Sequence, residues 1–159
     1  MKRVLLTGVS GTGKSSVCRR LRDLGHRAVD TDDDWPRWVV EARTEASEPD
    51  WLWREDLIDE LLDDHDGSML FVSGCRSNQA LFYPRFDYVV LLTAPVPVIV
   101  QRLSTRATND YGKDAEELRR ILREKQAIEP LLRRRATLEL DTTAPLDDIV
   151  AAILRHVEA

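Results

Sequence analysis

The sequence predicts a single α/β domain built on a parallel β-sheet with helices on both faces. Three observations support this class. The chain has 159 residues, which fits one domain. Short aliphatic runs alternate with amphipathic stretches along the chain, as is typical of βαβ units. A glycine-rich loop, residues 8–15, joins the first aliphatic run to the first amphipathic stretch.

The N-terminal elements follow from local patterns. Residues 3–7 are an aliphatic run ending at a glycine, which predicts a buried strand. Residues 15–24 form the next predicted element, a helix, because Val17, Leu21 and Leu24 share one of its faces.

A second short strand is predicted at residues 27–30. The next two stretches, residues 35–46 and 51–64, are predicted to be helices. In the second of these the apolar residues keep a period near 3.6.

The C-terminal half continues the alternation. We predict strands at residues 69–73 and 88–92 and helices at residues 96–106 and 115–135. A fifth strand is predicted at residues 137–140.

A helix at residues 146–157 ends the predicted fold, with Thr143 as its N-cap and Pro145 in its first turn. In such a sheet, ligands bind beyond the carboxyl ends of the strands. We therefore expect one cleft near the residues that follow Thr7, Val29, Val72, Leu92 and Leu140.

Composition narrows the class of protein. The chain carries 23 basic and 28 acidic residues, a net charge of −5, which argues against a general nucleic-acid coat protein. No apolar run approaches the ~20 residues of a membrane span. Two cysteines provide no disulfide framework, so we expect a reducing cytoplasm. Residues 102–135 hold 10 basic and 6 acidic residues, which suggests a local surface for anions.

The loop at residues 8–15 carries the strongest signal. It matches G-x-x-x-x-G-K-[ST] completely and lies between a predicted strand and a predicted helix. Backbone N–H groups of such a loop form an anion cradle at a helix N-terminus, and Lys14 adds a positive charge. A chance glycine-rich turn is the alternative. The residues expected to contact ATP are Gly11, Thr12, Gly13, Lys14, Ser15 and Ser16.

The residues beyond the loop bear on the reaction. An AAA- or ABC-type ATPase would have an acidic residue at the end of a strand to hold Mg²⁺ and polarise water, but the third and fourth predicted strands end without one. A GTP switch would need an Asn-Lys-x-Asp reader, which is absent from the sequence. Instead, Asp30, Asp32, Asp33 and Asp34 follow the second strand, where Mg²⁺ and an acceptor hydroxyl could neutralise them. A solvated acidic turn is the alternative, mainly for Asp33 and Asp34.

These motifs, with Gly74 after the third strand, a basic segment and the residues after the fifth strand, resemble the small P-loop kinases: shikimate kinase, gluconate kinase and the nucleoside-monophosphate kinases. The resemblance implies a three-layer fold with a five-stranded parallel sheet of order 2-3-1-4-5, a lid and an acceptor subdomain. It also implies that Asp30, with Ser15, serves Mg²⁺ and that Asp32 orients or deprotonates the acceptor hydroxyl. The shikimate kinases carry Gly-Gly-Gly after strand three, whereas this chain carries Gly74-Cys75-Arg76.

A lid is expected at about residues 102–118. Arg102 and Arg106 are four residues apart and share a helix face, and an Asn-, Asp- and Gly-containing break follows. Arginines there would neutralise charge on the transferring phosphoryl group. The resemblance implies that Arg102 packs on adenine, that Arg106 touches the phosphates, and that Thr143 and Pro145 line the adenine. For the arginines after this segment, Arg119, Arg120, Arg123 and Arg133 to Arg135, we prefer an ordinary basic surface helix.

The acceptor region is expected at about residues 35–66, within one domain spanning residues 1–159. All four tryptophans lie there within 19 residues, as either a pocket wall or a small core. Arginine can grip an anionic acceptor with two bonds. The acceptor contacts that we expect are Asp32, Arg54, Gly74 and Arg76, with Arg37 and Arg43 also available.

The sequence thus predicts a cytoplasmic Mg²⁺- and ATP-dependent kinase, monomeric or homodimeric, that phosphorylates a hydroxyl or phosphate of a small molecule. Lys14, Asp32 and Arg106 would be catalytic. Two alternatives stay open: a nucleotide or polynucleotide 5′-end kinase, and a regulatory ATP-binding module without an acceptor.

Overall fold

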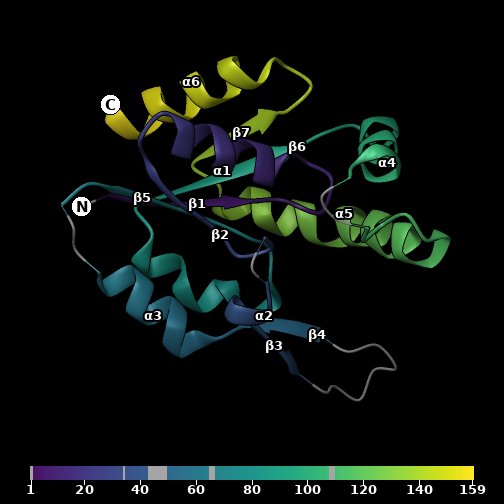
Figure 1. Cartoon of the computed structure of the whole chain (residues 1–159), viewed down its shortest axis with the longest axis horizontal. Coiled ribbons are helices and arrows are strands. Elements are labelled where there is room, and N and C mark those ends of the chain that lie inside the picture. Colours follow the sequence, from purple (N-terminus) through teal and green to yellow (C-terminus); the bar gives the residue numbers. More distant parts are fainter. Residues whose placement is uncertain (1, 34, 43–49, 65–66, 108–109) are drawn as a thin grey trace.

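A computed structural model describes residues 2–33, 35–42, 50–64, 67–107 and 110–159. Its centre is a five-stranded parallel sheet of order β2-β5-β1-β6-β7 (Figure 1). The strands are β1 (Lys2–Thr7), β2 (Arg27–Asp30), β5 (Met69–Ser73), β6 (Tyr88–Thr93) and β7 (Leu138–Asp141). Numbered among themselves, these strands have the order 2-3-1-4-5, so the predicted fold class is confirmed.

Helices cover both faces of the sheet (Figure 1). On one face lie α1 (Lys14–Asp23) and α6 (Leu146–Glu158), and on the other lie α3 (Glu55–Asp63) and α5 (Ala115–Arg135). The side chains of the central strand β1 show how one strand packs against helices on both faces. Val4 and Leu6 belong to the core under α1 and α6, whereas Leu5, between them, belongs to the opposite core. Alternate side chains point to opposite faces of a strand, so a continuous apolar run fills both layers.

Helix α4 (Val96–Thr105) and the start of α5 form a smaller layer next to the phosphate loop. Their apolar contacts make a separate cluster of Val9, Ala94, Ile99, Leu103 and Ile121. This cluster places the predicted lid segment against the loop. Residues 108–109 of that segment lie outside the described residues.

The two predicted helices at residues 35–46 and 51–64 are partly wrong. The chain instead forms a short α2 (Trp35–Trp38), a hairpin of β3 (Val39–Ala42) and β4 (Asp50–Trp53), and then α3. The hairpin is favoured over the predicted helices because Val39 and Trp53 pair across it and are both buried. Residues that are β-branched or aromatic pack well on a strand surface. Residues 43–49, with Arg43, and residues 65–66 lie outside the described residues.

Two further details differ from the predictions. The N-cap of α6 is Pro145 rather than Thr143, whose amide and hydroxyl both donate to Asp141 Oδ1 (2.9 and 2.8 Å). A 3₁₀ helix, η1 (Ser77–Arg85), also follows β5 where we predicted no element. Among the residues the structure describes, no helix is long and apolar enough to cross a membrane.

Candidate functional site

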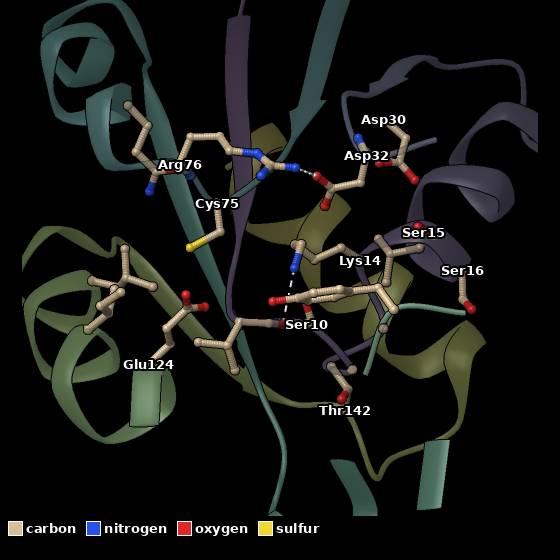
Figure 2. A pocket seen from close by; sticks show the side chains of 18 of the residues that line it. Ser10, Lys14, Ser15, Ser16, Asp30, Asp32, Cys75, Arg76, Glu124 and Thr142 are labelled. Atoms are coloured by element: carbon tan, nitrogen blue, oxygen red, sulfur yellow. Dashed lines mark hydrogen bonds and ion pairs between the residues drawn. The ribbon is translucent and has the colours of Figure 1, made fainter. Parts of the chain in front are cut away.

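A large cavity of about 1770 Å³ opens at the carboxyl ends of the sheet strands, where a parallel sheet is expected to bind ligands. Its walls come from the phosphate loop, the segment after β2, the start of η1, α4, α5 and the loop after β7. Figure 2 shows side chains from these distant segments turned towards one space. The predicted cleft is therefore present.

The phosphate loop, residues 8–15, is tightly built. Gly8 and Gly11 have φ values of 150° and 85°, in the region that favours glycine. A Cβ at Gly8 would lie 2.3 Å from the carbonyl oxygen of Leu92, and one at Gly11 would lie 3.0 Å from a methyl group of Ile99. Strand β6 thus approaches Gly8 too closely for a side chain, whereas a side chain at Gly11 would require the Ile99 methyl group to shift slightly.

Lys14 lies inside the loop that it would serve. It is only 6% exposed, and its Nζ donates to the carbonyl oxygens of Gly8 (2.5 Å) and Val9 (3.1 Å). The Thr12 hydroxyl donates to the same Val9 carbonyl (2.8 Å) and is fully buried. Lys14 lines the cavity together with Gly11, Gly13, Ser15 and Ser16, whereas Thr12 supports the loop from behind.

The segment after β2 separates its carboxylates. Asp30 is 4% exposed, and its Oδ1 accepts the amide of Asp32 (3.0 Å), which turns the chain so that both side chains line the cavity. Between them, the Thr31 hydroxyl donates to the Ser73 carbonyl (2.7 Å) and accepts from Trp53 Nε1 (3.1 Å). Asp33 is exposed at the cavity edge, and Asp34 lies outside the described residues.

Arg76, at the N-terminus of η1, reaches Asp32 from the neighbouring strand end. Its Nη2 donates to Asp32 Oδ1 (2.7 Å), as Figure 2 shows. The Arg76 backbone is tied to η1, because its amide donates to the side-chain oxygen of Gln79 (3.1 Å). The side-chain nitrogen of Gln79, Nε2, in turn donates to the hydroxyls of Thr7 (3.2 Å) and Tyr83 (3.0 Å). This network connects Arg76 and Asp32 to the end of β1.

The donors available for Mg²⁺ are oxygens, the chemistry that this ion prefers. The hydroxyl of Ser15 and the carboxylate of Asp30 both line the cavity. In the described part of the chain, no three His, Cys, Asp or Glu side chains gather to hold a metal ion. The protein would therefore supply only part of a shell, and Mg²⁺ typically completes such a shell with phosphates and waters. The residues fit this ion.

Arg102 links two walls of the cavity. Its Nη1 donates to the Gly11 carbonyl (3.3 Å) and to the Thr142 hydroxyl (2.8 Å), and its Nη2 donates to the Thr142 carbonyl (2.6 Å). Helix α4 is thereby tied both to the phosphate loop and to the loop after β7.

Arg106 follows α4 and also lines the cavity. Its Nη2 donates to the Tyr111 carbonyl. Burial lowers the pKa of its guanidinium, and nearby Asp32 and Asp110 act in the opposite direction. Arginine nevertheless stays charged at any working pH. The expected lid arginine therefore faces the cavity that also holds Asp32.

The four tryptophans divide between core and cavity. Trp38, at the end of α2, and Trp53, in β4, are buried in the core, with 7% and 1% of their surfaces exposed. Trp35 and Trp51 line the cavity and meet edge to face, with ring centroids 4.9 Å apart. The sequence left open whether the tryptophans form a pocket wall or a small core. Trp35 and Trp51 belong to the cavity wall, and Trp38 and Trp53 belong to the core.

Several predicted contacts lie elsewhere. Arg54 is exposed at the N-terminus of α3, where its Nε donates to the Val39 carbonyl (3.5 Å), and it does not line the cavity in the described structure. Gly74 is packed under Thr31 and Trp53 and shapes the wall from behind. Thr143 and Pro145, both described, are exposed and also outside the lining, which their neighbours Thr142 and Ala144 join instead.

Helix α5 contributes a wall that the sequence analysis missed. Glu124 points into the cavity opposite Lys14 and Cys75 (Figure 2). Arg120, Arg134 and Arg135, for which we prefer an ordinary basic surface helix, also line the cavity, and Arg134 and Arg135 are exposed. The sequence contains a pattern that could have indicated this wall, because residues three and four apart share one face of a helix. The residues of that face that line the cavity are Glu117, Arg120, Glu124, Ile128, Leu131 and Arg135.

Cys75 lines the cavity as a neutral thiol. Burial raises its pKa above the ordinary value, and the nearby charge of Lys14 offsets this only in part. Because the thiolate is the reactive form, this cysteine is not suited to act as a nucleophile.

Comparison with known proteins identifies the fold and the family. Residues 4–127 match the AAA domain family. A nucleotide-binding protein of Acidobacterium capsulatum is 32% identical over an alignment of 145 residues that covers 88% of this chain. The chain spans 44% of the length of that curated relative. The match shows a P-loop nucleotide-binding domain, the class that the phosphate loop predicted.

Solved structures share the fold. A shikimate kinase from Acinetobacter baumannii in complex with shikimate has a TM-score of 0.70 and 20% identity, with 99% of this chain and 93% of that chain covered. A shikimate kinase from Bacteroides thetaiotaomicron has a TM-score of 0.64 and 17% identity, with 99% of both chains covered. One from Aquifex aeolicus has a TM-score of 0.60 and 16% identity, with 98% and 96% covered.

Proposed function

Because this chain belongs to the AAA domain family, whose phosphate loop makes it a nucleotide-binding domain, we propose that it is an ATP-dependent kinase. It transfers the γ-phosphoryl group of Mg-ATP to a hydroxyl or phosphate group of a small-molecule acceptor. The proposed place of action is the cytoplasm, as a monomer or homodimer.

One observation carries this proposal: the cavity that holds Lys14 also holds Asp32, ion-paired to Arg76. Nucleotide binding alone needs no carboxylate beyond the metal ligand. Asp32 lines the cavity beside Arg76 at the start of η1, and the volume of about 1770 Å³ leaves room for a second molecule. A second molecule next to a triphosphate is what a kinase requires.

In the proposed reaction, an acceptor hydroxyl oxygen attacks the γ-phosphorus while the bond to the β–γ bridging oxygen breaks and ADP leaves. Asp32 accepts the hydroxyl proton, and Arg76 holds Asp32 and contacts the acceptor. The loop amides and Lys14 bind the phosphates. Arg106 neutralises charge on the transferring group, and the segment around it excludes water.

Ser15 and Asp30 would hold Mg²⁺, which when bound neutralises charge on the β- and γ-phosphates. Arg102 would lie at the base end of the nucleotide, together with the loop that contains Thr142 and Ala144.

The second candidate within enzymes is a nucleotide or polynucleotide 5′-end kinase. The cavity pair Trp35 and Trp51 favours it, because an exposed tryptophan can stack a base. Outside kinases, a regulatory nucleotide-binding module remains as an alternative.

The test is ATP-dependent phosphorylation of an acceptor panel: sugar acids, shikimate, nucleosides, nucleotides and 5′-hydroxyl oligonucleotides. Transfer of ³²P from γ-labelled ATP to a panel member by the wild-type chain, and its loss in Asp32→Asn, is the expected result. Tight ATP binding without transfer to any member, or steady ATP hydrolysis that no member affects, would overturn the proposal.

A further inference from the structure

The nitrogen atoms at the edge of the Arg102 guanidinium group are bound by two loops, the phosphate loop and the loop after β7. Its Nη1 and Nη2 groups donate to the Gly11 carbonyl, the Thr142 hydroxyl and the Thr142 carbonyl at 3.3, 2.8 and 2.6 Å. A guanidinium group donates in its plane and stacks through its face. With these edge donors engaged by protein, the face is the part of Arg102 that can serve a ligand in the cavity.

Thr142 fixes this arrangement with one buried hydroxyl. The residue is 5% exposed, and its Oγ1 donates to the Thr93 carbonyl (3.2 Å) while accepting from Arg102 Nη1. Its amide donates to the same Thr93 carbonyl (2.9 Å). The orientation of Arg102 therefore depends on the end of β6 through Thr142.

The surroundings indicate what the guanidinium face meets. Phosphates are held by the loop from Gly11 to Ser15, and Arg102 lies at the side of that loop that faces Thr142. The segment that follows Thr142 in the chain adds apolar residues to the cavity lining, namely Ala144, Leu146 and Ile149. A flat, largely apolar group attached to the phosphates, namely a nucleobase, suits this end.

We infer that Thr142 is a positioning residue for nucleotide binding: its hydroxyl sets the guanidinium of Arg102 so that its face packs on the nucleobase. This inference rests on one part of the proposed function, the placement of the base beside Arg102, and is independent of the phosphoryl acceptor.

The experiment measures binding by isothermal titration calorimetry with two probes, Mg-ATP and inorganic tripolyphosphate with Mg²⁺. The first carries a base and the second does not. Thr142→Val should weaken Mg-ATP binding about tenfold, the scale of one stacked cation. Binding of tripolyphosphate should change less than about twofold, because the loop amides and Lys14 are untouched. Thr142→Ser, which keeps the hydroxyl, should restore Mg-ATP binding.

The chain offers a matched control in Thr137. Its amide and hydroxyl both donate to the Val89 carbonyl (2.7 and 3.0 Å), as those of Thr142 do to Thr93, but at the opposite end of β6. Thr137→Val removes an equivalent hydroxyl tie between β6 and β7 and should leave both probes bound as in the wild type.

Equal weakening of both probes in Thr142→Val would mean that the hydroxyl only supports the fold and would overturn the inference. Unchanged Mg-ATP binding would overturn it as well, and so would a wild type that binds Mg-ATP no better than tripolyphosphate. Failure of the kinase proposal is a separate result, because a wild type that binds Mg-ATP without phosphorylating any acceptor still allows both binding comparisons.

Discussion

Arg76 Nη2 lies 2.7 Å from Asp32 Oδ1 and joins the segment after β2 to the segment after β5 across the mouth of the cavity. Both side chains are partly buried, with 23% and 29% of their surfaces exposed. The contact holds the Asp32 carboxylate in place in the cavity wall, and the first prediction tests what that carboxylate does.

Asp32→Asn should lower turnover at least ~100-fold, because the amide keeps the shape but cannot accept the acceptor proton. Asp33→Asn is the matched control. It removes a neighbouring, exposed carboxylate of the same turn and should leave turnover near the wild-type value. Steady-state phosphorylation of an acceptor identified in the panel gives both numbers. Near-normal turnover in Asp32→Asn would refute the assigned role.

Lys14→Ala should also lower turnover at least ~100-fold, the scale of one lost electrostatic contributor to phosphoryl transfer. Lys14 is buried in the loop and its ammonium contacts two loop carbonyls, so the loss acts where phosphates bind. Lys2→Ala serves as control, because Lys2 lies at the other end of the sheet and donates to Val157. Equal turnover of the Lys14→Ala and Lys2→Ala variants would contradict a role for Lys14 in phosphoryl transfer.

Gly74→Ala should destabilise the fold by about 1–3 kcal/mol, the usual cost of overpacking. A Cβ there would lie 2.5 Å from Thr31 Oγ1 and 2.9 Å from Trp53 Cζ2. At Gly25 a Cβ would meet nothing within 4 Å, although φ is +89°, so Gly25→Ala measures backbone strain without crowding. Urea denaturation compares the two variants. A larger loss at Gly25 would show that crowding does not decide the Gly74 position.

Stability should fall at alkaline pH because of Cys18. Burial, with a smaller contribution from Asp30, raises the pKa of the Cys18 thiol to about 12 from its ordinary value of 9.0. Between these values the unfolded chain releases a proton that the folded chain keeps. The stabilisation is therefore complete below about pH 9 and is lost as pH rises towards 12.

Cys18→Ala should flatten that dependence. The free energy of unfolding, from urea melts at pH 8, 9, 10 and 11, should fall less steeply with pH in the variant than in the wild type. The difference is at most about 1.4 kcal/mol per pH unit, the value for one proton. Parallel slopes would contradict the buried, neutral thiol.

The sequence determined the elements whose signals are local: the phosphate loop, the sheet strands, α1, α4, α5 and α6. Periodicity and loop chemistry act over a few residues, so these features can be read along the chain. The sequence also placed Asp30 and Asp32 at a strand end, where parallel topology brings them to the cleft.

Only the tertiary structure decided the rest. Residues 39–42 and 50–53 pair as a hairpin instead of forming helices, because Val39 and Trp53 gain burial against the sheet that no local pattern reveals. Contacts such as Arg76 with Asp32 and Arg102 with Thr142 join residues 40 or more positions apart, and the cavity brings Glu124 and Lys14 to the same space. Their partners are chosen by packing of whole elements, and spacing along the chain carries no information about such contacts.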